Sequence, residues 1–260
     1  MNLIEYICEE YGLGEFEANG CIMAGKVLVN DEVCSWVKYK VKKNDRIRMK
    51  YKKTDFVTRA GRKLEKALNV FGLDVTGKAA LDIGASEGGF TDCLLKHGAR
   101  KVYAVDVAYG ILDYGLRSNA KVVALERKNA RYLTEEDIPE TVDVITSDVS
   151  FISLLMVIPP NLRFLNSEGV AVLLFKPQFE LAPEDLGKNG IPLEQEKVVD
   201  RIRELVLDMR AEGLFIHEIA KSPIKGNSGN VEYLLWGSKN ASKLLGRQQV
   251  ADCVYGRGFQ

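Results

Sequence analysis

Apolar and polar positions along this chain follow two different periods. Over residues 58–237, short apolar runs typical of buried strands alternate with segments in which apolar residues recur at helical spacing. The expected strands are 79–83, 101–107, 122–125, 142–147, 169–175, 214–220 and 230–237, and the expected helices are 58–71, 88–97, 153–165 and 194–212. This alternation predicts an α/β fold with a parallel sheet that is covered on both faces. The last two strands have no helix between them, so they should pair antiparallel at one edge.

The first 50 residues show a different pattern, which predicts a small α+β unit. Helical spacing covers 3–8 and 18–23, two short strands flank a turn at Asn30 and Asp31, and a last strand covers 46–49. We therefore divide the chain into a unit at 1–50, a linker at 51–57, an α/β domain at 58–238 and a polar, peripheral tail at 239–260.

Composition narrows the class of protein. In 260 residues, 46% are hydrophobic and 28% are charged, which favours a packed core over wholesale disorder. No apolar run approaches the length of a membrane span, and the first ten residues lack the basic region of a secretory signal. The five cysteines are scattered and form no Cys-x-x-Cys pair. We therefore expect free thiols, a cytoplasmic location, no membrane partner and no metal.

The formal net charge of +0 hides strong local differences. Residues 5–17 include five glutamates and no lysine or arginine. Residues 38–53 include nine lysines and arginines, and Asp45 is their only acidic residue. A basic strip of this kind can bind the phosphates of a nucleic acid, although it could also be a solvated face. The candidates for binding RNA are Lys38, Lys40, Lys42, Lys43, Arg46 and Arg48, followed by Lys50, Lys52 and Lys53.

A glycine-containing loop follows the first strand of the α/β domain. It reads Asp82-Ile-Gly-Ala-Ser-Glu-Gly-Gly-Phe90 and leads into a helix, the arrangement that forms a nucleotide pocket at the carboxyl edge of a sheet. Its spacing differs from the dinucleotide fingerprint, and it contains no Lys or Arg to hold a phosphate. Asp106, at the end of the second strand, can accept hydrogen bonds from ribose hydroxyls. The loop thus favours a nucleoside cofactor without phosphates; the alternative is a purely structural turn.

Several motifs together resemble the FtsJ-type RNA methyltransferases, and more closely the TlyA (hemolysin A) family. They are Arg59-Ala-Gly-Arg-Lys-Leu-Glu-Lys-Ala-Leu68, Leu81-Asp-Ile-Gly-Ala-Ser-Glu-Gly-Gly-Phe-Thr-Asp-Cys93, Tyr103-Ala-Val-Asp-Val107, Leu125-Glu-Arg-Lys-Asn-Ala-Arg131, Ser147-Asp-Val-Ser-Phe-Ile-Ser-Leu154, Phe175-Lys-Pro-Gln-Phe-Glu180 and Gly229-Asn-Val-Glu-Tyr233. The resemblance covers residues 1–237. It implies a Rossmann-like class I methyltransferase sheet, S-adenosyl-L-methionine as the cofactor, and 2'-O-methylation of cytidines in ribosomal RNA or ribosomal subunits. The implied cofactor-binding residues are Asp82, Gly84, Ser86, Gly88, Gly89, Phe90, Asp106, Asn129, Ala130 and Asp148.

Four polar residues should meet at the carboxyl edge of the sheet. Asp148 and Lys176 follow strands, Glu232 begins the antiparallel strand, and Lys63 lies on the helix that leads into the domain. They resemble the K-D-K-E tetrad of the FtsJ type. A ribose hydroxyl is a weak nucleophile and needs a base. We assign this role to Lys176, because a buried lysine beside a second cation, here Lys63, loses its proton more easily. Asp148 and Glu232 would orient the amines.

Each of these residues has a plainer interpretation when it is taken alone. A lysine at the end of a strand is usually solvated, and an aspartate after a strand usually forms a turn. Methylation of a base nitrogen usually goes with Asp/Asn-Pro-Pro-Phe/Tyr after the fourth strand, where this chain has Asp148-Val-Ser-Phe151. Phe151 could stack on a base, but we favour a place in the core. Carbon methylation needs a nucleophilic cysteine, and Cys93 lies on the expected buried face of a helix.

The N-terminal unit is similar in layout to the alpha-L RNA-binding module of a small-subunit ribosomal protein and of many pseudouridine synthases. Ile22-Met-Ala-Gly-Lys-Val-Leu-Val-Asn30 carries this resemblance, but the usual helix-borne arginines are replaced by Asn2-Leu-Ile and Glu15-Phe16. The strip at 38–53 would then act alone, and we add Arg59 and Arg62 as RNA-binding residues. Alternatives are a methyltransferase for a base or a small molecule, and a membrane-active, hemolysin-like protein.

Overall fold

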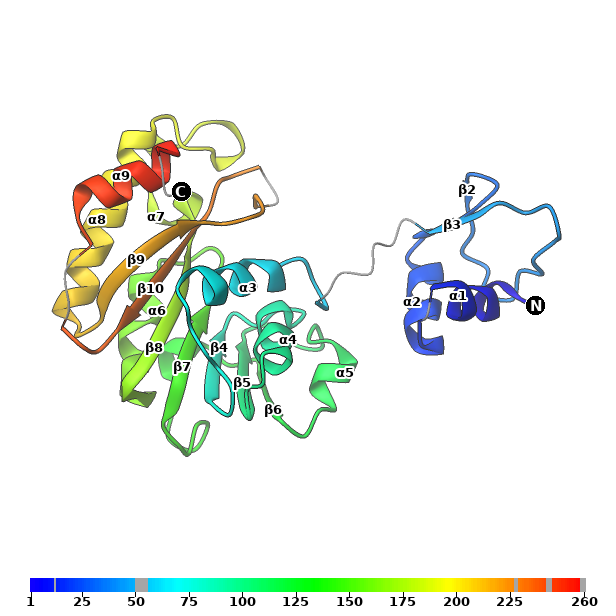
Figure 1. Cartoon of the computed structure of the whole chain (residues 1–260), viewed down its shortest axis with the longest axis horizontal. Coiled ribbons are helices and arrows are strands. Elements are labelled where there is room, and N and C mark those ends of the chain that lie inside the picture. Colours follow the sequence, from blue (N-terminus) through cyan, green and yellow to red (C-terminus); the bar gives the residue numbers. More distant parts are fainter. Residues whose placement is uncertain (12, 50–55, 227–228, 242–244, 258–260) are drawn as a thin grey trace. The chain divides into compact units, whose positions relative to one another are not determined.

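The structure is a computed structural model that describes residues 1–11, 13–49, 56–226, 229–241 and 245–257. It divides into two compact units, Met1–Thr54 and Asp55–Gln260 (Figure 1). Of the linker predicted at 51–57, residues 51–55 lie outside the described part, as do Lys50, Lys52 and Lys53 of the basic strip. The next residue, Phe56, is buried in the second unit.

The first unit packs two helices on a small antiparallel sheet. Its elements are α1 Leu3–Tyr11, α2 Glu15–Met23, β1 Val27–Val29, β2 Glu32–Val33 and β3 Ile47–Met49, with the sheet order β2-β1-β3. Asn30 and Asp31 both have positive φ, 54° and 69°, as a two-residue hairpin turn of type I′ requires. The predicted α+β layout and its hairpin are therefore confirmed.

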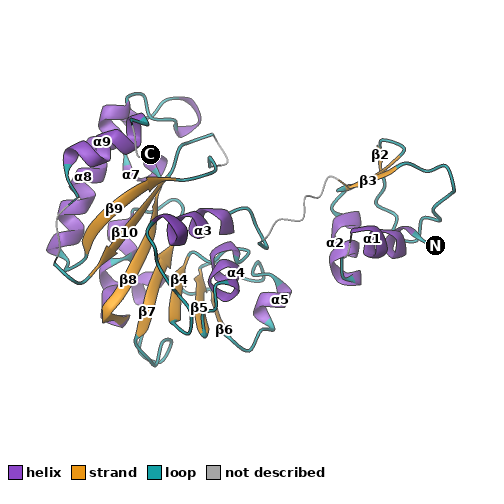
Figure 2. Ribbon diagram, viewed as in Figure 1, coloured by secondary structure: helices purple, strands orange, loops and turns teal. Residues whose placement is uncertain are grey.

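The second unit is built on a seven-stranded sheet. Its strands are β4 Ala79–Ile83, β5 Lys101–Asp106, β6 Val122–Glu126, β7 Val142–Ser147, β8 Leu165–Phe175, β9 Phe215–Lys221 and β10 Tyr233–Ser238. The order is β6-β5-β4-β7-β8-β10-β9, in which β4 to β8 are parallel and β10 pairs antiparallel with both of its neighbours (Figure 2). The predicted Rossmann-like α/β fold is confirmed, and so is the antiparallel pair at the edge.

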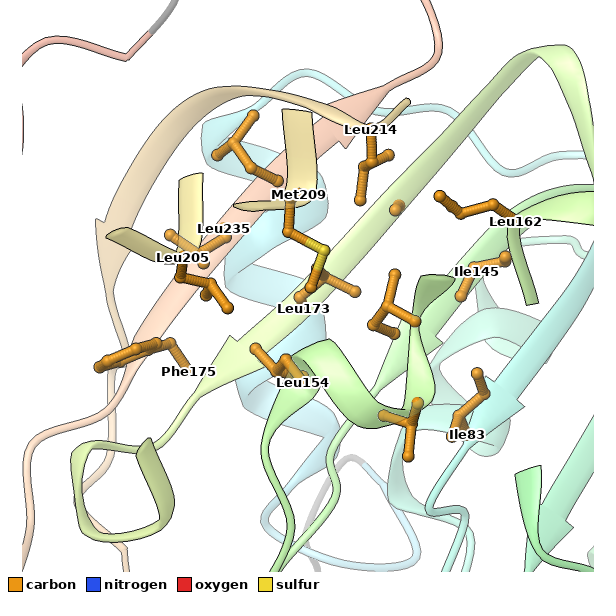
Figure 3. Packing of buried hydrophobic residues seen from close by; sticks show 14 of the residues in the cluster. Ile83, Ile145, Leu154, Leu162, Leu173, Phe175, Leu205, Met209, Leu214 and Leu235 are labelled. Atoms are coloured by element: carbon orange, nitrogen blue, oxygen red, sulfur yellow. The ribbon is translucent and has the colours of Figure 1, made fainter. Parts of the chain in front are cut away.

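Helices cover both faces of this sheet. On one face lie α3 Gly61–Val70, α4 Gly89–Lys96 and α5 Tyr114–Arg117, and the other carries α6 Leu154–Val157, α8 Gln195–Ala211 and α9 Arg247–Tyr255. On the second face, side chains from the strands, such as Leu173, meet Leu205 and Met209 of α8 (Figure 3). Alternate strand residues thus serve two cores, which leaves the carboxyl edge of the sheet as the place for polar side chains.

The structure adds two short helices that were not predicted, α5 and α7 Pro177–Glu180, and begins β8 at Leu165 instead of 169. Two further segments differ more strongly from the prediction. The helix expected at 153–165 is α6 followed by a 3-10 helix, Pro159–Phe164, because Pro159 and Pro160 lack the amide hydrogens that would continue an α-helix. Residues 239–260 were expected to form a polar tail, yet α9 lies within them and buries Val250, Cys253 and Val254 in the main core. Its apolar residues cover only the last two turns of a nine-residue helix, which gave too short a period to reveal it.

Candidate active site

The glycine loop after β4 packs directly against the end of β7. Ile83 pairs with Ser147 in the parallel register, so Gly84 and Asp148 lie side by side. Gly84 has φ +82°, and a Cβ there would lie 2.9 Å from the Asp148 carbonyl oxygen. Any other residue would be both strained and too close to the backbone of Asp148. The missing side chain therefore lets the two strand ends pack closely against each other.

Asp106 ends β5 beside this loop. Its Oδ2 accepts a hydrogen bond of 2.8 Å from the Ser86 amide, and its Oδ1 accepts one of 2.8 Å from the Ala108 amide. These two bonds fix the carboxylate, and each oxygen keeps a lone pair for a ligand. The sequence prediction that an acid at this position faces a ribose is compatible with this geometry.

A cavity of about 400 Å³ opens between Asp106 and Asp148. Of the predicted cofactor residues, it is lined by Gly84, Ser86, Asp106, Asn129, Ala130 and Asp148. Much of the remaining wall is apolar, including Val105, Ile111 and Val157. Lys128 also lines it, but the Lys128 ammonium is paired with Asp137 at 2.6 Å. The cavity therefore offers a carboxylate for a ribose, an apolar wall for a base and, among the described residues that line it, no unpaired lysine for a phosphate. These features fit a nucleoside without phosphates.

Four of the predicted cofactor residues lie elsewhere. Asp82 is wholly buried, and its carboxylate accepts hydrogen bonds from the hydroxyls of Thr91 and Thr146 at 2.7 and 2.9 Å. Gly88 leaves room for a helix, since a Cβ there would lie 2.2 Å from Leu116. Asp82 and Gly88 thus hold the loop in place through contacts inside the domain, and neither residue lines a cavity. The other two residues, Gly89 and Phe90, line the neighbouring cavity described below.

Asp82 gives the protein a characteristic pH dependence. Burial raises the pKa of this carboxyl from its ordinary 3.8 to about 6. Between about pH 4 and pH 6 the folded state therefore holds more protons than the unfolded state, so this group lowers the free energy of unfolding as the pH rises. Asp82→Asn should remove that loss, which amounts to about 3 kcal/mol at most. Denaturant unfolding of both proteins at pH 4 and pH 7.5 measures the difference, and parallel pH curves would contradict the prediction.

A second cavity, of about 640 Å³, holds the four predicted catalytic residues. The Lys63 ammonium donates a hydrogen bond of 2.7 Å to Glu232 and lies 3.8 Å from Asp148 Oδ2. The Lys176 ammonium lies 2.6 Å from Asp148 Oδ1. Asp148 therefore links the two lysines, and Lys63 in turn reaches Glu232. Lys63, Lys176 and Glu232 are at most 8% exposed, so their amines and carboxylate contact the cluster rather than solvent.

The sheet register explains how these residues meet. Phe175 of β8 pairs with Tyr233 of β10, so Lys176 and Glu232 occupy the next positions of two adjacent strands. Lys63 comes from the first turn of α3, a helix that packs on one face of the sheet through Leu64 and Ala67. The alternative interpretation of Lys63 and Lys176 as solvated lysines is wrong for this fold.

Phe151 stands where the two cavities adjoin, and our preference for a core position was wrong. The residue is 89% exposed, lines both cavities and has a φ of +63°. Its ring lies 4.8 Å, between centroids, from that of Phe179. Two further residues escaped the sequence analysis: Ser150, whose hydroxyl accepts a hydrogen bond of 2.9 Å from Lys176, and Gln178 of the cavity wall. Ser150 lies in the motif at 147–154 and Gln178 in the motif at 175–180, so these motifs could have indicated both residues.

Other chemistries lack support in the described residues. Cys93 is 0% exposed, and burial raises the pKa of its thiol well above the ordinary value, so it is a poor nucleophile. In the part of the chain that the structure describes, no three His, Cys, Asp or Glu side chains are grouped as metal ligands. None of the described helices is long and apolar enough to cross a membrane.

The predicted RNA-binding residues of the first unit are all exposed. They are Lys38, Lys40, Lys42, Lys43, Arg46 and Arg48. Val37, Tyr39 and Val41 pack against the core of the unit. The lysines that alternate with them, Lys38, Lys40 and Lys42, therefore project into solvent. Arg48 is paired with Asp31. In the second unit, Arg59 and Arg62 are also exposed, and Arg59 lines the larger cavity, which holds the four predicted catalytic residues and is called the catalytic cavity below.

Comparisons with known proteins agree with this geometry. A model of the FtsJ-like methyltransferase family matches residues 56–239. The protein named Hemolysin A from Brachyspira hyodysenteriae is 42% identical over 239 residues, 90% of this chain and 98% of that one. The 16S/23S rRNA (cytidine-2'-O)-methyltransferase TlyA of Mycobacterium tuberculosis is 40% identical over 202 residues, 77% of this chain and 75% of that one. A solved structure described as a candidate hemolysin, from Streptococcus thermophilus, has a TM-score of 0.76 and 32% identity, covering 98% of this chain and 94% of that chain.

Proposed function

Because this chain belongs to the FtsJ-like methyltransferase family, we propose that it methylates a ribose 2'-oxygen of ribosomal RNA with S-adenosyl-L-methionine as the methyl donor. The observation that carries the proposal is the meeting of two cavities at Gly84, Asp148 and Phe151. One cavity fits a nucleoside cofactor, and the other holds the buried lysine and carboxylate cluster. A group bound in the first thus lies beside the catalytic residues of the second.

Each residue of the cluster has a proposed task. When bound, S-adenosyl-L-methionine supplies a methyl group that is activated by its sulfonium charge. Asp106 would hold the ribose of the cofactor, and Gly84 would let it approach Asp148. Lys176 would take the proton of the 2'-hydroxyl, while Asp148, 2.6 Å away, holds its amine in place. Lys63 would keep a positive charge near the developing oxyanion, and Glu232 would orient Lys63.

An RNA substrate accounts for features that a small molecule would not need. Phe151 exposes an aromatic ring to solvent at the mouth of the site, although an exposed phenylalanine gains nothing from burial. Unpaired bases of RNA stack on rings of this kind. Arg59 at the cavity wall could meet a phosphate. We therefore favour RNA over a small-molecule substrate, and the sequence Asp148-Val-Ser-Phe151 favours ribose over a base nitrogen.

The finer details follow from the relatives. Cytidine is the proposed target nucleoside, because the printed name of the Mycobacterium tuberculosis relative specifies it. We also propose a cytoplasmic location, since the substrate is ribosomal RNA and all five cysteines are free thiols. The name Hemolysin A keeps membrane activity as the second candidate. Leakage from liposomes caused by the pure protein would favour that candidate.

Mapping of 2'-O-methyl marks tests the proposed function. Ribosomal RNA and ribosomal subunits that lack the mark are incubated with S-adenosyl-L-methionine and the protein, and ribose methylation is then mapped along the RNA. We expect new marks on cytidines in one or both substrates. Methylation of RNA without any ribose mark would refute ribose specificity, and ribose marks on other nucleosides would refute the cytidine assignment alone.

We expect the native protein to bind S-adenosyl-L-methionine and not NAD. Asp106→Ala should weaken the binding of S-adenosyl-L-methionine. The substitution removes a carboxylate whose free lone pairs would accept charged hydrogen bonds from the ribose, and its loss costs about 1–3 kcal/mol. Calorimetry with S-adenosylhomocysteine measures this loss. Asp113→Ala is a matched control, because Asp113 caps α5 with its side chain and lines neither cavity. Binding of NAD by the native protein without any response to S-adenosylhomocysteine would overturn the cofactor assignment.

Binding of RNA should depend on salt through the basic strip of the first unit. Replacing Lys38, Lys40, Lys42 and Lys43 with glutamine should reduce the slope of log affinity against log salt by about 0.7–0.9 for each phosphate that the strip no longer neutralises. Lys121→Gln is the control, since Lys121 of the second unit is exposed, directly precedes β6 and lines neither cavity. Titrations at several salt concentrations measure the slopes. An unchanged slope in the fourfold variant would mean that the strip is only a solvated face.

A further inference from the structure

The two chain segments that carry Asp148 and Lys176 are joined by a series of side-chain contacts. These post-strand segments are residues 148–154, after β7, and residues 176–181, after β8. Asp148 meets Lys176 at 2.6 Å, and the Phe151 and Phe179 ring centroids lie 4.8 Å apart. The series ends at Glu180, which contacts residues 153 and 154. Contacts thus continue along both segments, well beyond the catalytic pair itself.

Glu180 is the anchor at the far end of this series. Its Oε2 accepts a hydrogen bond of 2.8 Å from the Ser153 hydroxyl, and its Oε1 accepts one of 2.7 Å from the Leu154 amide. Arg201 of α8 donates to Glu180 twice, from Nη2 to the carboxylate at 3.2 Å and from Nε to the backbone carbonyl at 3.0 Å. The Glu180 side chain is only 2% exposed. Such a buried, fully bonded carboxylate holds its partners in one geometry.

The backbone at Phe151 shows why an anchor is needed. A bulky residue with φ of +63° is strained by about 1–2 kcal/mol, and such strain persists only where the surroundings enforce it. Burial of the ring cannot enforce it, because Phe151 is 89% exposed. The flanking residues are held instead, with Ser150 bonded to Lys176 on one side and Ser153 bonded to Glu180 on the other. The strained turn is thus fixed at both ends by the segment after β8.

We propose that Glu180, held by Arg201, is a positioning residue that sets the geometry of the Asp148–Lys176 pair and of the Phe151 ring. It touches neither the cofactor cavity nor the catalytic cavity and acts only through the two post-strand segments. The inference rests on the proposed function, since turnover on RNA is its main readout. If Glu180 loses its charge, Arg201 loses its buried carboxylate partner, and a glutamine amide can no longer accept from Ser153, Leu154 and Arg201 at both of its ends. The catalytic amine and the ring then sample wider geometries, which slows the chemical step.

The test compares Glu180→Gln with Glu204→Gln. Glutamine keeps the shape of Glu180 but removes the charge that binds Arg201. Glu204 is a second partner of Arg201, at 3.4 Å, with a side chain 66% exposed, so its replacement leaves the anchor intact. We expect the single-turnover rate at saturating cofactor and RNA to fall about tenfold or more in Glu180→Gln. The affinity for S-adenosylhomocysteine should stay close to that of the native protein. The thermal unfolding midpoint should fall, because a buried ion pair is broken, so the rate is measured at a temperature at which both proteins are folded. Glu204→Gln should match the native protein in all three.

Ser153 provides a second, independent variant. Ser153→Ala removes the hydroxyl that donates to Glu180 and should slow turnover, whereas Ser153→Thr keeps a hydroxyl and should restore it. Combined with Glu180→Gln, Ser153→Ala should cost less than the sum of the two separate losses, because both residues belong to one hydrogen-bonded cluster.

Three outcomes would overturn the proposal. The first is native turnover in both Glu180→Gln and Ser153→Ala. The second is a loss of turnover in proportion to a loss of folded protein, which indicates a role in stability alone. The third is a loss of cofactor affinity equal to the loss of rate. If the native protein itself places no methyl group on ribose, the proposed function fails instead, and this control separates the two failures.

Discussion

Lys176→Met is expected to slow methyl transfer by roughly a hundredfold or more, while the fold and the cofactor affinity stay nearly intact. The amine of Lys176 is buried in the catalytic cavity and held 2.6 Å from Asp148, but the residue does not line the cofactor cavity. Methionine approximates the volume of the lysine stem, so the packing against its neighbours should survive. Single-turnover methylation of ribosomal RNA, with calorimetry for the cofactor, measures both quantities.

Lys176→Arg distinguishes a base from a fixed charge. A guanidinium stays protonated at neutral pH, so this variant should fail as the methionine variant does. Lys221→Met is the matched control. Lys221 ends β9 at the same edge of the sheet, because it pairs with Tyr233, but it is exposed and lines neither cavity. Near-normal turnover in Lys176→Arg would show that only the positive charge matters, and the assignment of Lys176 as the base would then be wrong.

Asp148→Ala should damage both catalysis and cofactor binding. Asp148 lines both cavities and contacts both lysines, so its loss leaves the buried Lys176 without a carboxylate partner. Displacement of the amine by about an ångström is enough to cost roughly a hundredfold in rate. We also expect the cofactor affinity to fall by about 1–3 kcal/mol, through the loss of a charged group in the cavity wall.

The contrast between the two variants is the decisive comparison. Calorimetry with S-adenosylhomocysteine should separate Asp148→Ala, with weakened binding, from Lys176→Met, with binding preserved. Asp74→Ala serves as the control, because Asp74 is exposed in the loop before β4 and lines neither cavity. Equal cofactor affinity in Asp148→Ala and the native protein would mean that Asp148 acts on the lysines alone.

The candidate site was predictable where it depended on strand order. Parallel strands end at a common edge, so residues that follow β7 and β8 had to meet there, and Asp148 and Lys176 do so at 2.6 Å. The same reasoning could not separate Asp82 from Asp106. Both are acids near the end of a strand, but Asp82 points into the sheet and bonds two threonines, whereas Asp106 lines the cofactor cavity. Only the packing around each side chain decided which of them can meet a ligand.

The sequence by itself determined the strands and the edge at which the polar residues gather. Strands 79–83 and 142–147 were predicted with the bounds of β4 and β7, because both are mostly apolar or β-branched runs between polar or glycine-containing segments. Tertiary structure alone decided that Phe151 is exposed, that α9 is part of the core and that Glu180 anchors Ser153, 27 positions away. The spacing of apolar residues indicates which positions of a single helix or strand are buried. Whether a side chain is covered, strained or bonded depends on residues that only folding brings beside it.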